Sequence, residues 1–282
     1  MTIRECRDET NEILTSIGND EAAVITDILI SHYLHTDRGS MLVRLDDQAP
    51  EDLPYLLADA VNMLSVGMPV QYIMGSCWFY GLEVKVGPGC FIPRADTEIL
   101  AKAAIGLLRQ GGSFIELCAG SGCVSMAIAE NVKGVHGTAA ELSLKALPFT
   151  EANLEKYPNI KVKRADVLDP DDLNMLFEEW GEGYDLLVCN PPYIPTADIS
   201  GLDVQVQYEP ETALDGGENG LKYYRYIIAN ADLIMKPSHR ILFEVGIGQA
   251  SAVVQMLSVM GYSVAVFKDL GGIDRVVLGE KM

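Results

Sequence analysis

From about residue 95 onward, short apolar runs alternate with segments of helical spacing, and this alternation constrains the fold more than any other feature. The runs typical of strands are 113–118, 134–140, 160–165, 184–189, 240–245, 262–267 and 275–278. The segments typical of helices are 124–130, 143–157, 220–235 and 249–260. Alternating strands and helices predict an α/β fold with a mostly parallel sheet covered by helices on both faces. Such a sheet binds ligands at the carboxyl ends of its strands, near the point where the strand order reverses.

The first 75 residues have a different pattern. Their apolar residues recur at helical spacing, as over 24–33 and 53–64, and turn-forming stretches separate these pieces. Residues 76–92 change again, because they alternate around Gly81 as a β-hairpin does. The sequence therefore predicts a helical domain over 1–75, a hairpin connector over 76–92 and an α/β domain over 93–282.

The chain is strongly acidic, with a formal net charge of −19. Residues 1–75 contain 13 Asp or Glu side chains against four arginines and no lysine. A chain with this charge repels phosphate backbones, so we expect no direct binding to nucleic acid. Two interpretations of the acidic first segment stay open: a solvated surface, or a docking face for a basic macromolecule.

Other features narrow the compartment and the chemistry. No apolar run approaches the roughly 20 residues that span a bilayer, and the N-terminus lacks a signal-peptide pattern, so we expect no membrane association. The six cysteines lack paired metal-ligand spacing, and several lie in apolar runs. These observations predict a cytoplasmic protein without a disulfide framework or a metal site.

The first predicted strand of the α/β region ends in a glycine turn, Cys118-Ala119-Gly120-Ser121-Gly122. A strand followed by Gly-x-Gly and a helix lets a ligand approach the backbone where a Cβ would clash. The next strand ends at Glu141, about 20 residues on, where a carboxylate typically accepts the two hydroxyls of a ribose. A charge at a helix N-terminus is the alternative role for Glu141. These features predict a nucleoside-containing cofactor but do not distinguish nicotinamide from S-adenosylmethionine.

The fourth predicted strand runs directly into Asn190-Pro191-Pro192-Tyr193. Proline has no N–H to donate, so the strand must stop there, and two prolines stiffen the backbone that carries Asn190. An amide or aromatic-amine nitrogen is a poor nucleophile because its lone pair is delocalised. The Asn190 side-chain oxygen and the Pro191 carbonyl can accept both N–H bonds of such an NH₂ group, while Tyr193 packs on its plane. The sequence thus predicts methyl transfer to a planar nitrogen, without a strong base.

These residues also carry a family resemblance. Asn-Pro-Pro-Tyr after the fourth strand is similar to the motif of methyltransferases that act on exocyclic adenine nitrogen or on glutamine amide nitrogen. From about residue 20 to the C-terminus, the chain resembles the second group, the HemK/PrmC family of release factor glutamine methyltransferases. Besides the glycine turn, the stretches that carry the resemblance are 67–75, 91–98, 190–194, 208–214, 243–246 and 275–279. The Phe-x-Pro-Arg stretch from Phe91 and the Glu-Pro-x-x-Ala-Leu stretch from Glu209 are specific to this group.

The resemblance implies a Rossmann-like, seven-stranded methyltransferase domain preceded by a small helical domain and a β-hairpin. It implies S-adenosylmethionine as cofactor, S-adenosylhomocysteine as product and peptide chain release factors as protein partners. The cofactor contacts that it implies are Cys118, Ala119, Gly120, Ser121, Gly122, Glu141, Asp166, Val167 and Asn190. The implied substrate contacts are Phe91, Asn190, Pro191, Pro192 and Tyr193, with Asn190, Pro191 and Tyr193 as the catalytic set. The helical domain would dock the release factor, whose Gly-Gly-Gln loop presents the target glutamine.

Four positions depart from the family's usual pattern, and one of them is Ala95, which replaces a common proline. Glu116 stands where the first strand usually has Asp, Cys118 stands for the first glycine of the turn, and Glu141 stands for a ribose-binding Asp. A Cβ and a sulfur at position 118 would narrow the cofactor cleft. Asp166 could accept a hydrogen bond from the adenine amino group, or it could cap the N-terminus of a helix. Arg94 could equally form a structural ion pair, so it is not included among the site residues.

Three other functions remain as hypotheses. An adenine N-methyltransferase would share the chemistry but should carry a basic region for its target, which this chain lacks. A catalytically inactive cofactor-binding or interaction protein is suggested by Cys118 and opposed by the intact Asn190 to Tyr193 stretch. A dehydrogenase would share only the glycine turn.

Overall fold

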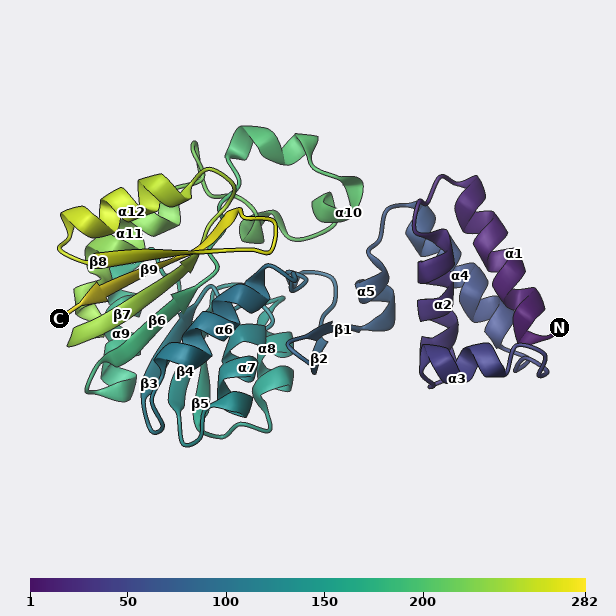
Figure 1. The fold of residues 1–282 in the computed structure, drawn as a ribbon, viewed down its shortest axis with the longest axis horizontal. Helices are drawn as coiled ribbons and strands as arrows, with labels where there is room; N and C mark the ends of the chain where they lie inside the picture. Colours follow the sequence, from purple (N-terminus) through teal and green to yellow (C-terminus); the bar gives the residue numbers. More distant parts are fainter. The chain divides into compact units, whose positions relative to one another are not determined.

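The computed structural model describes residues 1–282, apart from the side chains of residues 179 and 180. The chain forms two compact units (Figure 1). The first contains Met1–Gly75 and Val204–Tyr208, and the second contains Ser76–Asp203 and Glu209–Met282. The chain therefore passes between the units more than once.

The first unit is helical. Its helices are α1 (Ile3–Ser16), α2 (Ala22–Tyr33), α3 (Arg38–Val43), α4 (Leu53–Ser65), α5 (Val70–Met74) and α10 (Val204–Gln207). Buried side chains of α1, α2 and α4, such as Leu14, Leu29 and Leu57, share one core. Full burial of such a side chain contributes about 1.5–3 kcal/mol. Position 67 takes glycine because a Cβ there would lie 2.4 Å from Val204 Cγ1.

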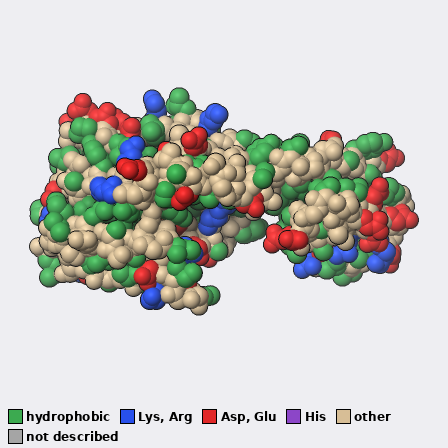
Figure 2. All heavy atoms as spheres, turned by 90° about the horizontal axis from the view of Figure 1, so that it is seen from above, with side chains coloured by type: hydrophobic (Ala, Val, Ile, Leu, Met, Phe, Trp, Pro, Cys, Tyr) green, Lys and Arg blue, Asp and Glu red, His purple; other side chains and the backbone are tan. Residues whose placement is uncertain are grey.

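All four arginines of this unit are paired with aspartates. Arg7 and Arg38 both bond the buried Asp27, at 2.6 and 2.9 Å. The other two pairs are Arg4 with Asp46 and Arg44 with Asp47. Because these pairs use every arginine, the unpaired charged side chains of this unit are acidic, and several of them lie on the face that Figure 2 shows.

The second unit begins with a hairpin. Strands β1 (Ser76–Phe79) and β2 (Leu82–Lys85) pair antiparallel. Tyr80 and Gly81 form the two-residue turn with φ of 50° and 74°, and such left-handed turns suit the twist of paired strands. The strands end at Lys85, so residues 86–92 continue without a strand.

A seven-stranded sheet forms the centre of the second unit, in the order β5-β4-β3-β6-β7-β9-β8. Its strands are β3 (Ser113–Leu117), β4 (His136–Glu141), β5 (Ile160–Arg164), β6 (Tyr184–Cys189), β7 (Met235–Glu244), β8 (Ser263–Lys268) and β9 (Asp274–Lys281). The first five strands of this order are parallel, and only β9 runs antiparallel to its neighbours β7 and β8. The predicted mostly parallel sheet is confirmed. The strand order reverses between β3 and β6.

Helices cover both faces of this sheet (Figure 1). One face carries α6 (Thr97–Leu107), α7 (Cys123–Asn131) and α8 (Leu147–Leu154). The other carries α9 (Pro170–Trp180), α11 (Lys222–Asn230) and α12 (Ala250–Val259). Side chains of α9, α11 and α12 share a core with strand residues such as Ile115, Leu187 and Phe243. Short 3₁₀ turns lie at Thr196–Gly201, Glu211–Ala213 and Ala231–Leu233.

Two of the predicted helices were too long. The segment predicted over 143–157 begins as a turn, with the Ala146 N–H bonded to the Ser143 carbonyl, and α8 starts only at Leu147. The segment predicted over 220–235 ends at Asn230, because Met235 already pairs with Tyr184 in the sheet. Helices α1, α3, α5, α6 and α9 were not predicted. In the part of the chain that the structure describes, no helix has both the length and the apolar character that a membrane span requires.

Candidate active site

The glycine turn and the Asn-Pro-Pro-Tyr segment lie side by side where the strand order reverses. Strands β3 and β6 are neighbours, and Leu117 is opposite Cys189 in their register. Cys118 and Asn190 are the next residues of these two strands, so both segments leave the same edge of the sheet. Glu141 ends the adjoining strand β4. The fold therefore brings the predicted site residues of three strands together at the switch point.

The glycine turn has an unusual backbone. Cys118, Gly120 and Gly122 all have positive φ, at 56°, 55° and 74°. A Cβ at Gly122 would lie 3.1 Å from Thr150 Cγ2 and 3.2 Å from Leu154 Cδ1, so glycine is needed there for both conformation and space. Ala119 and Ser121 between them are buried. The loop is thus a tight backbone turn that leads into α7.

Two α8 side chains hold this loop, and neither was predicted. Thr150 Oγ1 donates to the Gly120 carbonyl at 2.6 Å. Asn153 Nδ2 donates to the Ser121 carbonyl and to the Lys85 carbonyl, both at 2.9 Å, and Asn153 Oδ1 accepts from the Lys85 N–H at 2.8 Å. Asn153 therefore joins the glycine loop to the hairpin.

The side chain of Cys118 packs against the core beneath the sheet edge. Burial and a hydrogen bond with the Cys118 thiol raise the pKa of Cys189. A non-glycine residue in the left-handed region costs roughly 1–2 kcal/mol, which this packing offsets in part. The structure thus accounts for how the sulfur is accommodated. The expected narrowing of a cofactor cleft stays a prediction.

Glu116 lies buried directly below the loop. Its Oε2 accepts hydrogen bonds from the backbone N–H and the hydroxyl of Ser125, the former at 2.8 Å. Burial raises the pKa of Glu116 to about 7. The carboxyl therefore anchors the first turn of α7 from inside the sheet.

Both carboxylate oxygens of Glu141 bond backbone N–H groups. Oε2 accepts from Gly120 and Oε1 from Ser143, each at 2.7 Å. Burial raises the pKa of Glu141, and these hydrogen bonds oppose the shift. A carboxylate offers about four acceptor positions, so these hydrogen bonds do not use all of the positions that a ribose hydroxyl could occupy. The longer side chain of Glu141 reaches the loop itself, which an aspartate would do less readily.

Asp166 and Val167 follow β5, the edge strand next to β4. Asp166 Oδ1 accepts from the Leu168 N–H at 2.9 Å, and Asp169 is the residue that caps α9. The alternative interpretation of Asp166 as a helix cap is therefore wrong. Val167 is buried in the core, so its side chain has a packing role.

The Asn-Pro-Pro-Tyr corner is anchored through its backbone and its side chains. Pro191 and Pro192 are buried. The Tyr193 carbonyl accepts from Gln249 Nε2 at 2.8 Å, and the Ile194 N–H donates to the Leu214 carbonyl at 2.9 Å. Gln249 was not predicted, and it fixes the corner from the start of α12.

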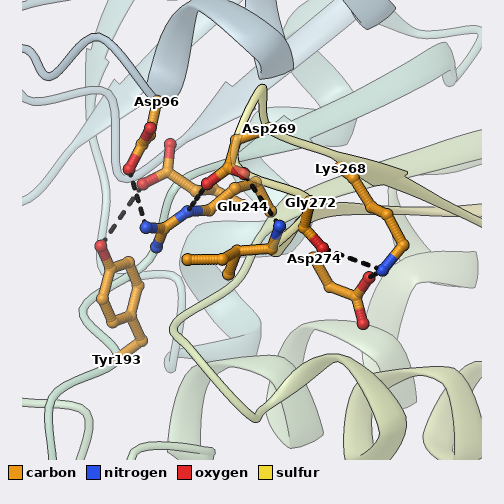
Figure 3. Close-up of polar contacts among 9 residues, drawn as sticks. Asp96, Tyr193, Glu244, Lys268, Asp269, Gly272 and Asp274 are labelled. Carbon is orange, nitrogen blue, oxygen red and sulfur yellow. Dashed lines mark hydrogen bonds and ion pairs between the residues drawn. The ribbon is translucent and has the colours of Figure 1, made fainter.

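Side chains of the corner meet a buried polar group below it. Asn190 Nδ2 donates to Thr97 Oγ1 at 3.3 Å. The Tyr193 hydroxyl donates to Glu244 Oε1 at 3.4 Å, as Figure 3 shows. Because the amide nitrogen of Asn190 is used in this way, its Oδ1 is the atom left to accept from a substrate. Burial raises the pKa of Tyr193, so its hydroxyl stays protonated and remains a donor. Thr97 and Glu244 were not predicted as site residues.

Phe91 lies beside the glycine loop, since a Cβ on Gly120 would be 3.9 Å from Phe91 Cβ. The Arg94 guanidinium lies 5.0 Å from the centroid of the Phe91 ring. Arg94 also pairs with the buried Glu209, whose Oε2 accepts from the Ile92 N–H at 2.9 Å. The Phe-x-Pro-Arg and Glu-Pro stretches of the sequence are thus joined through Glu209. Arg94 forms a structural ion pair.

Comparison with known proteins gives two family models on this chain. The PrmC N-terminal domain matches residues 5–75, and the methyltransferase small domain matches residues 95–204. Among solved structures, a methyltransferase from Pyrococcus furiosus covers 72% of this chain and 90% of its own, with a TM-score of 0.52 at 15% identity. At that identity the likeness concerns the fold alone, which is that of a methyltransferase.

Curated relatives match along nearly the whole chain. The release factor glutamine methyltransferase of Geobacter sulfurreducens is 36% identical and covers 99% of this chain and 96% of that protein. The enzyme of the same name from Thermodesulfovibrio yellowstonii is 34% identical and covers 90% of each. With a methyltransferase fold, an Asn-Pro-Pro-Tyr corner beside its glycine loop and relatives of this similarity, the chain belongs to the family of release factor glutamine methyltransferases.

Proposed function

We propose that this chain transfers a methyl group from S-adenosylmethionine to the side-chain amide nitrogen (N5) of the glutamine in the Gly-Gly-Gln motif of peptide chain release factors. The observation that carries the proposal is the register of β3 and β6, which sets Asn190 beside the glycine turn at Cys118. A nitrogen held at the corner therefore lies next to the loop assigned to the methyl donor. Family membership identifies the nitrogen as that of a glutamine.

The residues at the sheet edge fit S-adenosylmethionine. Gly120 and Gly122 present backbone without a Cβ, and the Glu141 carboxylate keeps acceptor positions for a ribose diol. Asp166 at the end of β5 would accept from the adenine amino group, and Asn190 would close the site on the β6 side. Cys118, Ala119, Ser121 and Val167 would complete the contacts through their backbone. When bound, S-adenosylmethionine supplies a methyl group on a sulfonium, which is electrophilic without further activation.

The Asn-Pro-Pro-Tyr corner contributes to catalysis by positioning the substrate amide. Asn190 Oδ1 and the Pro191 carbonyl accept the two N–H bonds of the glutamine amide, which orients the nitrogen and stabilises the positive charge that builds on it. Tyr193 and Phe91 pack on the planar amide and exclude water. The buried Pro191 and Pro192 keep the backbone of the corner rigid. The amide proton leaves after transfer, so no strong base is required.

The direct test uses labelled S-adenosylmethionine with a purified release factor and with the same factor carrying alanine in place of the loop glutamine. We expect label on the first factor and none on the second. Label that persists on the altered factor, or that appears on neither, contradicts the assignment. Duplex DNA in a third reaction tests the adenine alternative, and label there would favour it.

The helical unit is the proposed docking face for the release factor. Its arginines are all paired with aspartates, so its remaining acidic side chains face solvent without an arginine to offset them. Reversing the charges of the exposed Glu9 and Glu12 on α1 should raise KM for the intact factor about tenfold, since steering by surface charge changes association. The same reversal at Glu151 on α8 and at Glu155, the residue that follows this helix, is the matched control.

A short Gly-Gly-Gln peptide separates docking from chemistry, because it is too small to use the helical unit. Its turnover should be unchanged in both reversed variants. Equal KM values for the intact factor in the α1 and α8 variants would contradict the docking role. We keep a cytoplasmic location and the lack of direct nucleic-acid binding as parts of this proposal, because the protein substrate acts in translation and the chain carries a net charge of −19.

A further inference from the structure

A row of polar side chains runs beneath the Asn-Pro-Pro-Tyr corner. Asn190 Nδ2 donates to Thr97 Oγ1 at 3.3 Å. The Thr97 hydroxyl in turn lies close enough to the Glu244 carboxyl to lower its pKa. The Tyr193 hydroxyl meets the same carboxyl at Oε1, 3.4 Å away (Figure 3). Two residues of the corner thus lead, by separate routes, to one buried acid.

Glu244 is firmly placed and poorly satisfied. It is the last residue of β7 and is 2% exposed, and its backbone carbonyl accepts from the Tyr224 hydroxyl at 2.8 Å. Its Oε2 has no well-formed hydrogen bond to any residue that the structure describes. The contact with Thr97 is therefore loose, as hydrogen bonds of a site without its substrate often are, and it can tighten when substrate binds. A buried carboxyl with a spare oxygen needs a reason beyond packing.

A fixed cation lies close to this acid. Arg275 pairs with Asp96 Oδ2 at 3.0 Å and with Asp269 Oδ2 at 3.2 Å. The turn between β8 and β9 holds Asp269, whose Oδ1 accepts from the Ile273 N–H at 2.8 Å, and Figure 3 shows this turn next to Glu244. The guanidinium favours the charged form of the Glu244 carboxyl and so lowers its pKa, whereas the carboxylate of Asp96 raises that pKa by a larger amount.

The direction of the hydrogen bonds follows from the acid. An ionised carboxylate can only accept, so the Thr97 hydroxyl must donate to it. The lone pairs of Thr97 then face Asn190, and only the NH₂ end of the Asn190 amide can satisfy them. The carbonyl end, Oδ1, is left facing the substrate. An amide at position 244 would remove this constraint, because its own NH₂ group can donate to Thr97. The Thr97 hydroxyl could then donate to Asn190 Oδ1, so that the Asn190 NH₂ group would face the substrate.

We propose that Glu244 is a positioning residue that sets the orientation of the Asn190 amide through Thr97 and holds the Tyr193 ring through its hydroxyl. This inference rests on the proposed function, since it concerns the acceptor that the substrate amide requires. Glu244 touches neither substrate nor cofactor in this scheme. Its effect is that Oδ1, rather than Nδ2, meets the substrate N–H.

The scheme implies a dependence on pH. Burial raises the pKa of Glu244 to about 7, so its acceptor-only, ionised form predominates above that pH. Below it, the protonated carboxyl can donate to Thr97, and turnover should fall as the pH drops. The titratable and charged groups that face Glu244 are Asp96, Arg275, Tyr193, Tyr224 and Cys189. Burial raises the pKa of the tyrosines and of Cys189 well above 7, so none of those three titrates in the same range.

The test compares Glu244→Gln, Thr97→Val and Thr97→Ser with the parent enzyme, using a Gly-Gly-Gln peptide over pH 5.5 to 9. We expect E244Q and T97V to lose about tenfold or more in kcat, with KM for the peptide and Kd for S-adenosylmethionine within about twofold. T97S keeps the hydroxyl and should recover most of the turnover that T97V loses. The parent should show an acid limb with an apparent pKa near 7, which E244Q should lack.

A kcat for E244Q equal to that of the parent, or the same acid limb in both, overturns the inference. If E244Q does not fold, the threonine pair decides: equal losses in T97S and T97V overturn it, and recovery in T97S supports it. Failure of the proposed function looks different, because the parent enzyme itself would then place no methyl group on the glutamine.

Discussion

The glycine loop and the Asn-Pro-Pro-Tyr corner lie on adjacent strands, but they are held in different ways. The loop is fixed through its backbone, by Thr150, Asn153 and Glu141. The corner is also held through its backbone, by Gln249 and Leu214, but in addition it depends on side-chain contacts. These run from Asn190 to Thr97 and from Tyr193 to Glu244. A backbone held in place tolerates changes in the side chains that it carries, whereas a row of side chains tolerates few. Three of the four departures from the family pattern fall on the loop side, and the fourth, Ala95, lies two residues before Thr97, while Asn190 to Tyr193 are intact.

The largest effect should come from the corner. Asn190→Ala removes the side-chain acceptor, and loss of one such polar group typically costs about 100- to 1,000-fold in kcat. We expect this loss to exceed any change in Kd for S-adenosylmethionine. Steady-state kinetics with a Gly-Gly-Gln peptide and calorimetric titration of the cofactor give the two numbers. Near-normal turnover in this variant would contradict the claim that the corner depends on its side chains.

On the loop side, Asn153→Ala should act mainly on the cofactor. The change leaves the Ser121 carbonyl and both backbone groups of Lys85 without their partner, at a cost of about 1 kcal/mol each. We expect Kd for S-adenosylmethionine to rise about tenfold while kcat at saturation changes less than threefold. Asn131→Ala is the matched control, because Asn131 bonds only within its own helix, at Ala127. A kcat effect larger than the Kd effect would show that the two halves are not separable.

The acid beneath the loop gives a prediction on stability. The folded-state pKa of Glu116, about 7, lies above its ordinary value of 4.5, so the folded protein holds this proton more tightly than the unfolded chain. Its contribution is therefore complete below pH 4.5 and is lost as the pH rises to about 7. Glu116→Gln should reduce the fall in the free energy of unfolding between pH 5 and pH 8 by on the order of 2 kcal/mol. Chemical unfolding at both values measures it, and an identical fall in both proteins contradicts it.

The smallest effect should come from Cys118→Gly. Glycine relieves a left-handed backbone but adds freedom to the unfolded chain, and the two terms of about 1 kcal/mol nearly cancel. We expect cofactor binding that is unchanged or slightly tighter, and a thermal midpoint within a few degrees of the parent. A large loss of affinity would instead show that the sulfur takes part in binding.

The predictable part of the fold and site consists of features that a short stretch of chain specifies. The strand over 184–189 was predicted with its observed bounds, because the two prolines that follow the apolar run have no N–H to donate and so end the strand. The structure places Cys118, Glu141 and Asn190 at one edge of the sheet, as expected, because parallel strands have their carboxyl ends at one edge. Their roles in binding stay a prediction.

The supporting residues escaped prediction because their partners are far along the chain. Asn153 bonds Lys85 across 68 positions, and Asn190 bonds Thr97 across 93. Nothing in the residues around Thr97 or Glu244 reveals that they meet below the corner. Helix α9 was missed although Pro170 and three aspartates mark its start, since its apolar face becomes evident only against the sheet.

The segment Val204–Tyr208 affects how this protein can be recombined with its relatives. It packs with residues 1–75 although the chain on either side of it belongs to the α/β unit, and Val204 fills the space that Gly67 leaves. In a chimaera that exchanges only the first 75 residues, the helices of the relative would have to pack against the Val204–Tyr208 segment of this chain. Inheritance of the helical unit thus requires two exchanges, one of residues 1–75 and one of Val204–Tyr208, a short distance after the Asn-Pro-Pro-Tyr corner.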